Sequence, residues 1–416
     1  MTGIQLVEHA PHTTHDLPAA IGRALAASRI VDAAPDPYRT GGWRLRAGSK
    51  VGAFVVRAPG EDPVTLRITP KVPIARLFFL LGYALNPRIH QEGVVEVTAH
   101  TELVPFFAQT YERVQERALR QGVLQGYRHT EEASPVLRGR LRETDQVRRH
   151  HGRLFPLEVA YDEYTTDIPE NRLLRAATER LLSLPSVPAG VRRSLQHQRA
   201  RLIDAEPLLR GAAPPRWRPS RLNLRYQPAL RLAETVLRRE SPEHLPGDAT
   251  VDGFLLDMNK LFEDFVCVAL REALAAYGGH CALQARGVHL DADGTIRMRP
   301  DLVRYGDDGR PLTVVDAKYK AQKPDGVPDA DVYQMLAYCT ALGLPEGHLI
   351  YARGGALHAS HRVRNVGIAI HQHVLDLGGT PTELLGMVRD LARLMARGAG
   401  PASPPKIVSA APHAMR

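Results

Sequence analysis

Cysteine is scarce in this chain of 416 residues, which contains only Cys267, Cys281 and Cys339. None of the three belongs to a CxxC pair or a metal-finger spacing, which argues against a zinc site built on cysteine. The low, odd count is typical of a protein from a reducing cytoplasm. Cys267 and Cys339 fall in apolar patterns of helical spacing, so we expect both thiols to be buried in the core.

Long apolar runs are also missing. The longest, at Ile74–Leu85, is interrupted by Arg76, and a membrane span needs about 20 apolar residues. This segment therefore predicts a buried helix. The N-terminal residues lack a basic start followed by an apolar stretch, so they do not resemble a signal peptide. We expect a cytoplasmic protein.

Phosphate-binding loops of the GxxxxGK[ST] type are absent, so the chain is not expected to hydrolyse a nucleotide by itself. What the chain has is a surplus of basic residues: 54 Lys and Arg against 45 Asp and Glu. A basic balance favours polyanionic partners such as DNA or RNA. Many basic proteins bind no nucleic acid, so charge alone leaves this open.

Pattern and composition divide the chain into four regions. Short alternating segments at 43–47, 51–57 and 65–69 predict a β-rich module. We expect a partner-docking region of mixed α/β structure at 1–125, a mainly helical basic region at 126–245, an α/β domain at 246–400 and a disordered tail at 401–416. In the second region, Asp167 is the expected N-cap of a helix over Thr166–Leu184.

The third region begins with an apolar segment, Val251–Ala276, that predicts one long helix. Strand-like segments follow at 288–290, 295–298, 302–305 and 312–316, then a helix at 331–341 and a strand at 348–352. This order predicts an α/β domain with a mixed central sheet.

Two acidic residues and a lysine lie around the turn Gly306–Arg310 in that domain. Asp301 begins the first of two predicted strands, and Asp316 and Lys318 end the second. Residues two apart on a strand point to one face, so Asp316 and Lys318 project together and the hairpin brings Asp301 beside them. Adjacent carboxylates repel unless a cation lies between them. Mg²⁺ prefers such oxygen ligands and activates water for attack on a phosphodiester.

Three further residues fit the same site. Glu263, in the preceding helix, supplies a possible third carboxylate for the metal. Gln334 and Tyr338 are four residues apart and share one helix face. The alternative interpretation of Asp316 and Lys318 is a surface ion pair at a strand end, because such triplets occur by chance in most proteins of this size.

The order of these residues resembles the PD-(D/E)xK nuclease superfamily, and the chain as a whole resembles the McrC family, the nuclease subunits of modification-dependent restriction systems. The resemblance spans about residues 40 to 355. Its stretches are LRITPKV (66–72), GYRHTEEASPVLRGRL (126–141), DIPENRLL (167–174), NKLFEDFV (259–266), RPDLV (299–303), VVDAKYK (314–320) and VYQMLAY (332–338).

The resemblance implies a mixed α+β fold, in which N-terminal β-rich and helical regions precede a PD-(D/E)xK nuclease domain with a mixed central sheet. It implies catalysis by Asp301, Asp316 and Lys318, with Glu263 and Gln334 in support. The metal would be Mg²⁺ or Mn²⁺, bound by Asp301, Asp316 and Glu263.

The resemblance also implies partners. Members of this family dock through their N-terminal region onto a hexameric AAA+ GTPase, McrB, and stimulate its GTP hydrolysis. McrB reads methylated or otherwise modified double-stranded DNA, and translocation precedes cutting. The chain's lack of a nucleotide-binding loop agrees with such a partner-dependent role.

A basic stretch at 135–153 contains Arg138, Arg140 and Arg142, which alternate as the exposed face of a strand would. They are candidates for DNA phosphates or for acidic patches on the partner, and a solvated basic face is the alternative. Phosphate binding would weaken steeply with salt. Lys320 and Tyr338 are further candidate DNA contacts.

Two other functions remain open. The chain could be a non-catalytic adaptor that activates the AAA+ partner, although the intact acid–acid–lysine set argues against a relic. It could also be a stand-alone repair or RNA-processing nuclease, which a neighbouring AAA+ GTPase gene would contradict.

Overall fold

The computed structural model divides the chain into two compact units. Unit 1 comprises Met1–Ile74 and Val97–Leu256, and unit 2 comprises Ala75–Glu96 and Asp257–Arg416. The structure describes residues 2–85, 103–151, 153–184, 187–209, 212–238, 244–245, 249–321, 329–353 and 358–398. The expected disordered tail at 401–416 lies outside the described residues. No helix in the described part of the chain is long and apolar enough to cross a membrane.

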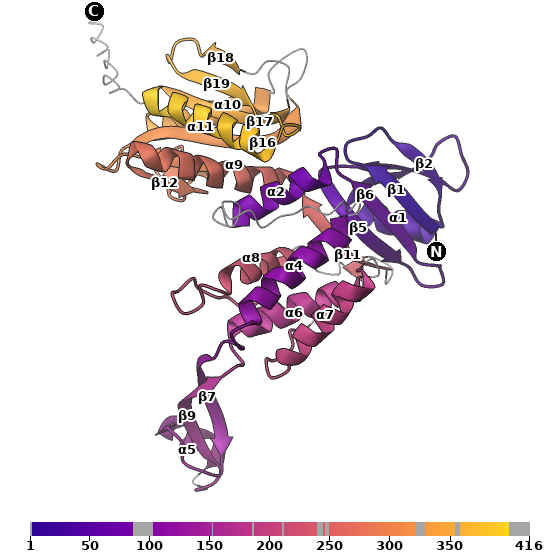
Figure 1. Ribbon diagram of the computed structural model, residues 1–416, viewed down its shortest axis with the longest axis vertical. Coiled ribbons are helices and arrows are strands. Elements are labelled where there is room, and N and C mark those ends of the chain that lie inside the picture. The colour runs from indigo at the N-terminus through magenta and orange to yellow at the C-terminus, as the bar shows by residue number, and fades with distance from the viewer. Residues whose placement is uncertain are drawn as a thin grey trace, which may run out of the picture. The chain divides into compact units, whose positions relative to one another are not determined.

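Unit 1 is built on a five-stranded sheet with the order β1-β6-β5-β11-β10 (Figure 1). Its strands are β1 (Thr2–Val7), β5 (Lys50–Arg57), β6 (Val64–Thr69), β10 (His244–Leu245) and β11 (Ala249–Asp257). Burial alternates along β6, where Val64, Leu66 and Ile68 are buried between half-buried or exposed neighbours. This period of two confirms the β-rich module expected from the sequence.

A second sheet of unit 1 has the order β2-β4-β3 and packs against helix α1 (Ala19–Ser28). Its strands are β2 (Thr13–Asp16), β3 (Val31–Pro35) and β4 (Gly42–Ala47). Gly22 of α1 faces the indole of Trp43, where an added Cβ would lie 1.9 Å from a ring atom. Glycine therefore allows the helix to approach the sheet closely at this point.

Four helices form the rest of the core of unit 1: α4 (Leu103–Leu119), α6 (Pro169–Ser183), α7 (Ala189–Arg201) and α8 (Gln227–Arg238). Tyr111 of α4 donates to the Leu174 carbonyl of α6 over 3.0 Å. The prediction of Asp167 as an N-cap was wrong. Ile168 occupies that position, and the Asp167 carboxylate instead accepts hydrogen bonds from the Arg172 side chain. An arginine within reach competes with the helix N–H groups for the carboxylate.

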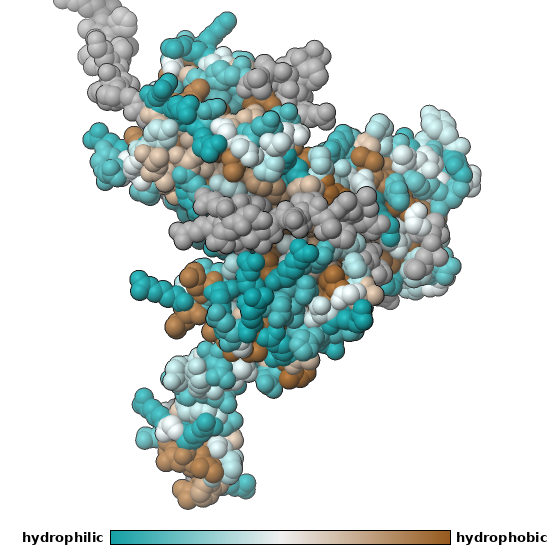
Figure 2. All heavy atoms as spheres, in the orientation of Figure 1, coloured by the Kyte–Doolittle hydropathy of each residue, from teal (hydrophilic) through white to brown (hydrophobic). Residues whose placement is uncertain are grey.

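A three-stranded sheet with the order β7-β9-β8 occupies residues that the sequence assigned to a mainly helical region. It comprises β7 (Gly126–Ser134), β8 (Arg140–Leu141) and β9 (Leu157–Thr165), with the short helix α5 (Glu143–His150) between β8 and β9. Figure 2 shows hydrophobic residues gathered at the far end of this sheet. Those that are exposed there include Val136, Leu137, Leu154 and Phe155.

Unit 2 contains a six-stranded mixed sheet with the order β12-β15-β16-β17-β19-β18. Its strands are β12 (His280–Leu283), β15 (Leu302–Tyr305), β16 (Pro311–Ala321), β17 (Glu346–Arg353), β18 (His358–Arg362) and β19 (Ala369–Val374). The central strands β16, β17 and β19 are parallel, and the outer pairings are antiparallel. The expected mixed sheet is therefore present. A separate ribbon pairs β13 (Val288–His289) with β14 (Arg297–Met298).

The α-helices in the described residues of unit 2 are α2 (Ile74–Leu85), α9 (Met258–Leu274), α10 (Asp329–Leu342) and α11 (Pro381–Gly398). The apolar run at Ile74–Leu85 is a buried helix, as expected. Its Phe79 and Tyr83 rings lie 5.8 and 5.5 Å from the Phe265 ring of α9. Residues 75–85 thus belong to unit 2 and nearly all of β11 belongs to unit 1, a division that differs from the expected boundaries at 125 and 245.

The prediction of one helix over Val251–Ala276 was wrong in its first part. Residues 249–257 form strand β11, and α9 begins at Met258 after the N-cap Asp257, whose carboxylate accepts from the Asn259 N–H over 3.0 Å. An apolar run without a clear period does not separate a buried strand from a helix. Gly253 is the residue that marks the strand: without a side chain it packs directly against the neighbouring strand, where an added Cβ would lie 2.2 Å from Phe54.

Four histidines come together where β17, β18 and β19 meet. Register pairs His348 with His371 and His358 with His373. His373 lies 3.1 Å from His348 and 3.2 Å from His358 through ring nitrogens. Burial, followed by the neighbouring imidazoles, lowers the pKa of His373 to about 3 and that of His348 well below its usual value. Both rings are therefore neutral in the folded protein near neutral pH.

This cluster predicts a loss of stability in acid. Because the folded pKa of His373 is depressed below 6.5, the unfolded chain binds a proton that the folded chain refuses, and stability falls as pH drops below 6.5. Between pH 7 and 5 we expect a loss of about 2 kcal/mol from this group. His373→Gln should show a smaller drop in Tm over this interval than the exposed control His361→Gln. Equal drops in both variants would contradict the assignment.

Candidate active site

Asp301 and Asp316 lie opposite one another at the same end of the β15–β16 pair. Leu302 pairs with Val315, which places the preceding and following residues side by side. The Asp301 carboxylate accepts a hydrogen bond from the backbone N–H of Ala317, over 2.9 Å. Asp301 is 7% and Asp316 2% exposed. The hairpin therefore brings the two predicted acids together in a buried position.

Lys318 completes the set on strand β16. Its Nζ lies 2.6 Å from Asp316 Oδ2, as the alternation of side chains along a strand requires. Burial of the ammonium opposes its charge, but Asp316, Asp301 and Asp331 outweigh this and raise the pKa of Lys318 above its usual value. Lys318 is therefore a fixed cation that contacts one of the two acids.

Both acids hold protons unusually strongly. Burial raises the pKa of Asp301 to about 6, although the Ala317 N–H favours its charged form. Burial and then the nearby Asp301 raise the pKa of Asp316 to about 7, in spite of Lys318. Two negative charges are thus unfavourable here with only one ammonium present. A further cation would relieve the repulsion.

Glu263 joins the acids through a residue that sequence analysis missed. The Gln284 amide donates both to Asp301 Oδ1, over 3.0 Å, and to Glu263 of α9. Burial raises the pKa of Glu263. Gln284 adopts a left-handed backbone conformation with φ of 49°, which is uncommon for a residue other than glycine and is found at functional sites. No motif marks it, because its place depends on the unpredicted pairing of β12 with β15.

Helix α10 contributes Gln334 and Tyr338. The Gln334 amide donates to the Tyr338 hydroxyl over 2.8 Å, and that hydroxyl donates to the Arg299 carbonyl over 3.3 Å. Burial, followed by Asp316, raises the pKa of Tyr338 to about 12. Tyr338 thus lies near the acids, whereas the exposed Gln334 reaches it from the outside. Tyr338 is only 4% exposed, which leaves little of its ring for a DNA contact.

Asp331 is a second residue that sequence analysis missed. This buried carboxylate of α10 accepts from the Tyr351 hydroxyl over 3.0 Å and helps to raise the pKa of Lys318. It lies in the first turn of the helix that follows β16, a position that spacing alone does not connect with the acid pair. Asp331 thus adds a negative charge to the surroundings of the lysine.

The predicted basic strand at Arg138, Arg140 and Arg142 was wrong, because β8 contains only Arg140 and Leu141. The Arg138 guanidinium stacks on Tyr161, 4.4 Å from the ring centre. Arg142 pairs with Glu131 over 2.8 Å and also contacts Asp145. Intramolecular partners therefore occupy two of the three arginines, and Arg140 is exposed. The Lys320 side chain lies outside the described residues.

The acid pair has donors suited to a divalent cation, since Mg²⁺ typically takes one or two carboxylates together with water and phosphate. Within the described ranges, no three His, Cys, Asp or Glu side chains are arranged so that they could hold a metal ion. Glu263, Asp301 and Asp316 are near one another, but Gln284 bridges the first two. The three-carboxylate ligand set remains a prediction, and the pair Asp301–Asp316 fits a cation by its chemistry and charge.

Comparison with known families gives one clear relationship. The family described as McrBC 5-methylcytosine restriction system component matches residues 45–352. The chain belongs to this family. The residues matched to the McrBC family include the acid pair, Lys318 and the helices α9 and α10.

One solved structure shows a similar fold over most of the chain. A chain of the refined half-complex from a tetradecameric assembly of Thermococcus gammatolerans McrB AAA+ hexamers with bound McrC is 18% identical, with a TM-score of 0.54. The alignment covers 94% of this chain and 100% of that one. The cryo-EM structure of the T. gammatolerans McrBC complex gives 22% identity, 66% and 88% coverage and a TM-score of 0.41. No curated protein matches.

The raised pKa of Asp316 predicts that Asp316→Asn stabilises the metal-free protein at high pH. The folded pKa lies above the ordinary value of 3.8, so the folded chain keeps a proton that the unfolded chain releases, and stability is lost as pH rises from 3.8 to about 7. The asparagine variant lacks this loss, which is of the order of a few kcal/mol.

The measurement is Tm in EDTA across this pH range. The excess in Tm of Asp316→Asn over the wild type should widen from pH 5 to pH 8. The exposed control Asp390→Asn should follow the wild type throughout. A constant difference between Asp316→Asn and the wild type would show that Asp316 is not a strained buried acid.

Proposed function

We propose that this McrBC-family chain is the metal-dependent DNA endonuclease subunit of a modification-dependent restriction system. The observation that carries the proposal is the buried pair Asp301–Asp316 beside Lys318, at the end of the central hairpin in unit 2. The raised pKa values of Asp301 and Asp316, about 6 and 7, mean that two negative charges repel at this site. A bound cation would offset that repulsion. The domain is proposed to be a PD-(D/E)xK nuclease.

Asp301 and Asp316 would hold Mg²⁺ or Mn²⁺, and Glu263, which Gln284 connects to Asp301, is proposed as a further ligand. A bound divalent ion supplies Lewis-acid stabilisation of the scissile phosphate and lowers the pKa of water. The Ala317 N–H and the Gln284 amide orient the Asp301 carboxylate toward Asp316. Each residue is held by a neighbour on a strand or helix, which favours a preorganised site.

Lys318 has a separate part in the proposed reaction. Its ammonium is charged near neutral pH and contacts Asp316 directly. Beside a phosphodiester it would hold a non-bridging oxygen or orient the attacking water. Tyr338 and Gln334, joined by their hydrogen bond, are the residues that α10 contributes to this side of the site.

The proposed partner is an AAA+ GTPase. A similar chain occurs in a structure described as McrB AAA+ hexamers with bound McrC. We propose that this chain binds a hexamer of that kind, stimulates its GTP hydrolysis and cuts double-stranded DNA whose modified bases the hexamer recognises. The GTPase activity then belongs to the partner, and the acid pair in unit 2 does the cutting.

Cleavage should depend on the acid pair while partner activation does not. Asp301→Asn and Asp316→Asn each remove a carboxylate that would hold the metal, and loss of several kcal/mol of transition-state stabilisation lowers the rate by about 10³-fold or more. The measurement is cutting of methylated plasmid by the complex with the AAA+ partner, with GTP hydrolysis followed in parallel. GTPase stimulation should persist in both variants.

Asp390→Asn is the matched control for cleavage, because Asp390 is an exposed carboxylate of α11 in the same unit. If the folded Asp316→Asn subunit still cuts, the site assignment is wrong. If the wild-type complex stimulates GTP hydrolysis but never cuts with Mg²⁺ or Mn²⁺, the chain is an adaptor.

Metal binding should be visible without cleavage. A ligand that binds only the folded state raises stability with its concentration. Mg²⁺ or Mn²⁺ should therefore raise the Tm of the full-length wild-type chain, and EDTA should reverse the change. Asp301→Asn and Asp316→Asn should lose this response. A metal-induced rise that survives in the double variant would place the ion elsewhere.

A further inference from the structure

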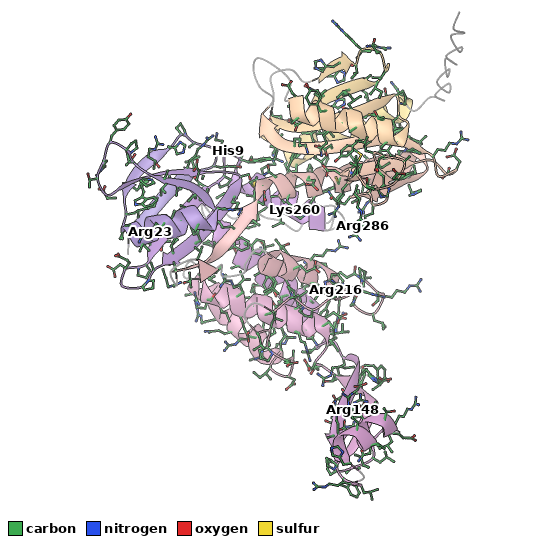
Figure 3. The ribbon with its side chains drawn as sticks, turned by 180° about the vertical axis from the view of Figure 1, so that it is seen from behind. His9, Arg23, Arg148, Arg216, Lys260 and Arg286 are labelled. Carbon is green, nitrogen blue, oxygen red and sulfur yellow. The ribbon has the colours of Figure 1, made fainter. Side chains whose placement is uncertain are left out.

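We propose that Arg286, Arg297 and Arg299 form a phosphate clamp that holds the DNA backbone beside the proposed cutting site. The inference deepens the proposed function, on which it rests, by naming a surface that holds the substrate of that site. All three residues are exposed: Arg297 lies in the ribbon β13–β14, and Arg286 and Arg299 lie in the two chain segments beside it. Arg286 is labelled in Figure 3, on the part of unit 2 that carries α9 and β12.

Backbone hydrogen bonds connect these segments to the acid pair. The Gln284 N–H donates to the Asp301 carbonyl over 2.8 Å, and the Ala285 N–H donates to the Pro300 carbonyl over 3.0 Å. This antiparallel register brings Arg286 and Arg299 next to one another, two residues beyond the Gln284–Asp301 contact. Further out, Arg297 pairs with His289. The arginines therefore continue outward from the catalytic end of the sheet.

The backbone that carries Arg299 is fixed on both sides. Its carbonyl accepts from the Tyr338 hydroxyl, and Pro300 after it is buried. Exposure alternates along the strand, since Arg297 and Arg299 are exposed and Met298 between them is half-buried against the core. The two guanidinium groups thus project from one side of a supported strand rather than from a free loop.

None of these three arginines has a side-chain partner among the residues that the structure describes. Arginines of the neighbouring β15–β16 hairpin differ: Arg304 donates to the Tyr277 carbonyl over 2.7 Å, and Arg310 lies 3.6 Å from Asp308. Near the tip, the carboxylate of Asp291 is occupied by Thr295 and Ile296. Like charges on neighbouring strands are unfavourable unless an anion lies between them.

A DNA backbone supplies that anion in the required form. Guanidinium groups bind phosphate oxygens in a bidentate manner, and successive phosphates form a row of charges. The acid pair would bind one phosphodiester through the metal, so the arginines two to four residues away would meet its neighbours on the same duplex. An acidic surface of a protein partner would fit the same charges, but it would not explain why the row starts at the cutting site.

The test is equilibrium binding of the full-length chain to a fluorescein-labelled DNA duplex in EDTA, followed by anisotropy at increasing KCl. The variant replaces Arg286, Arg297 and Arg299 with glutamine. Each phosphate contact contributes about 0.9 to the slope of log Kd against log salt, so the slope should fall by about 2 to 3. At low salt, affinity should drop about 10- to 100-fold.

Arg310→Gln is the matched control, an exposed arginine of the same unit at the opposite end of the β15–β16 pair. It should keep the wild-type slope. Replacing the three clamp arginines with lysine should retain most of the slope, because charge is preserved while bidentate geometry is lost. Tm of each variant verifies folding.

The outcomes separate the two proposals, since binding in EDTA requires no cutting. An unchanged slope in the folded glutamine variant overturns the phosphate clamp whatever the cleavage result. A reduced slope in a chain that never cuts supports the clamp and contradicts the nuclease. Loss of binding to the AAA+ partner with unchanged DNA binding would assign the arginines to the protein and also overturn the clamp.

Discussion

The hydrogen bond from the Ala317 N–H to the Asp301 carboxylate is the contact on which the site depends. It ties the residue before β15 to the second half of β16 and places one buried acid beside another. The fold thereby holds two groups that would separate in water, and the cost appears as raised pKa values of about 6 and 7. A site that is unfavourable when empty of a cation is well suited to take one up.

Sequence alone located the acid pair and its lysine because their positions depend only on short-range rules. A turn at Gly306–Arg310 and the two-residue period of a strand suffice to bring Asp301, Asp316 and Lys318 together. Gln284 and Asp331 escaped notice because they approach through strand pairing and helix packing between distant segments. No local pattern records which strand becomes the outer neighbour of β15.

The same distinction explains the fold predictions. The strands of the first module follow from alternating apolar residues, and the buried helix at Ile74–Leu85 follows from its long apolar run. Strand β11 could not be predicted in this way, because it is an apolar segment immediately before an apolar helix. Only the close approach of Gly253 to Phe54 distinguishes the strand from the helix. The Asp167 cap and the basic strand at Arg138–Arg142 failed for another reason: nearby charged and aromatic side chains offered stronger partners than the expected ones.

Helix α2 has a consequence for biosynthesis. Tyr83 hydrogen-bonds to Glu272, 189 residues later, and its ring packs against Phe265. The helix leaves the ribosome long before the strands of unit 2, so contacts of such long range form late. A fragment that starts after residue 245 would leave aromatic surface of α9 bare. Incomplete or truncated chains therefore lack a finished unit 2.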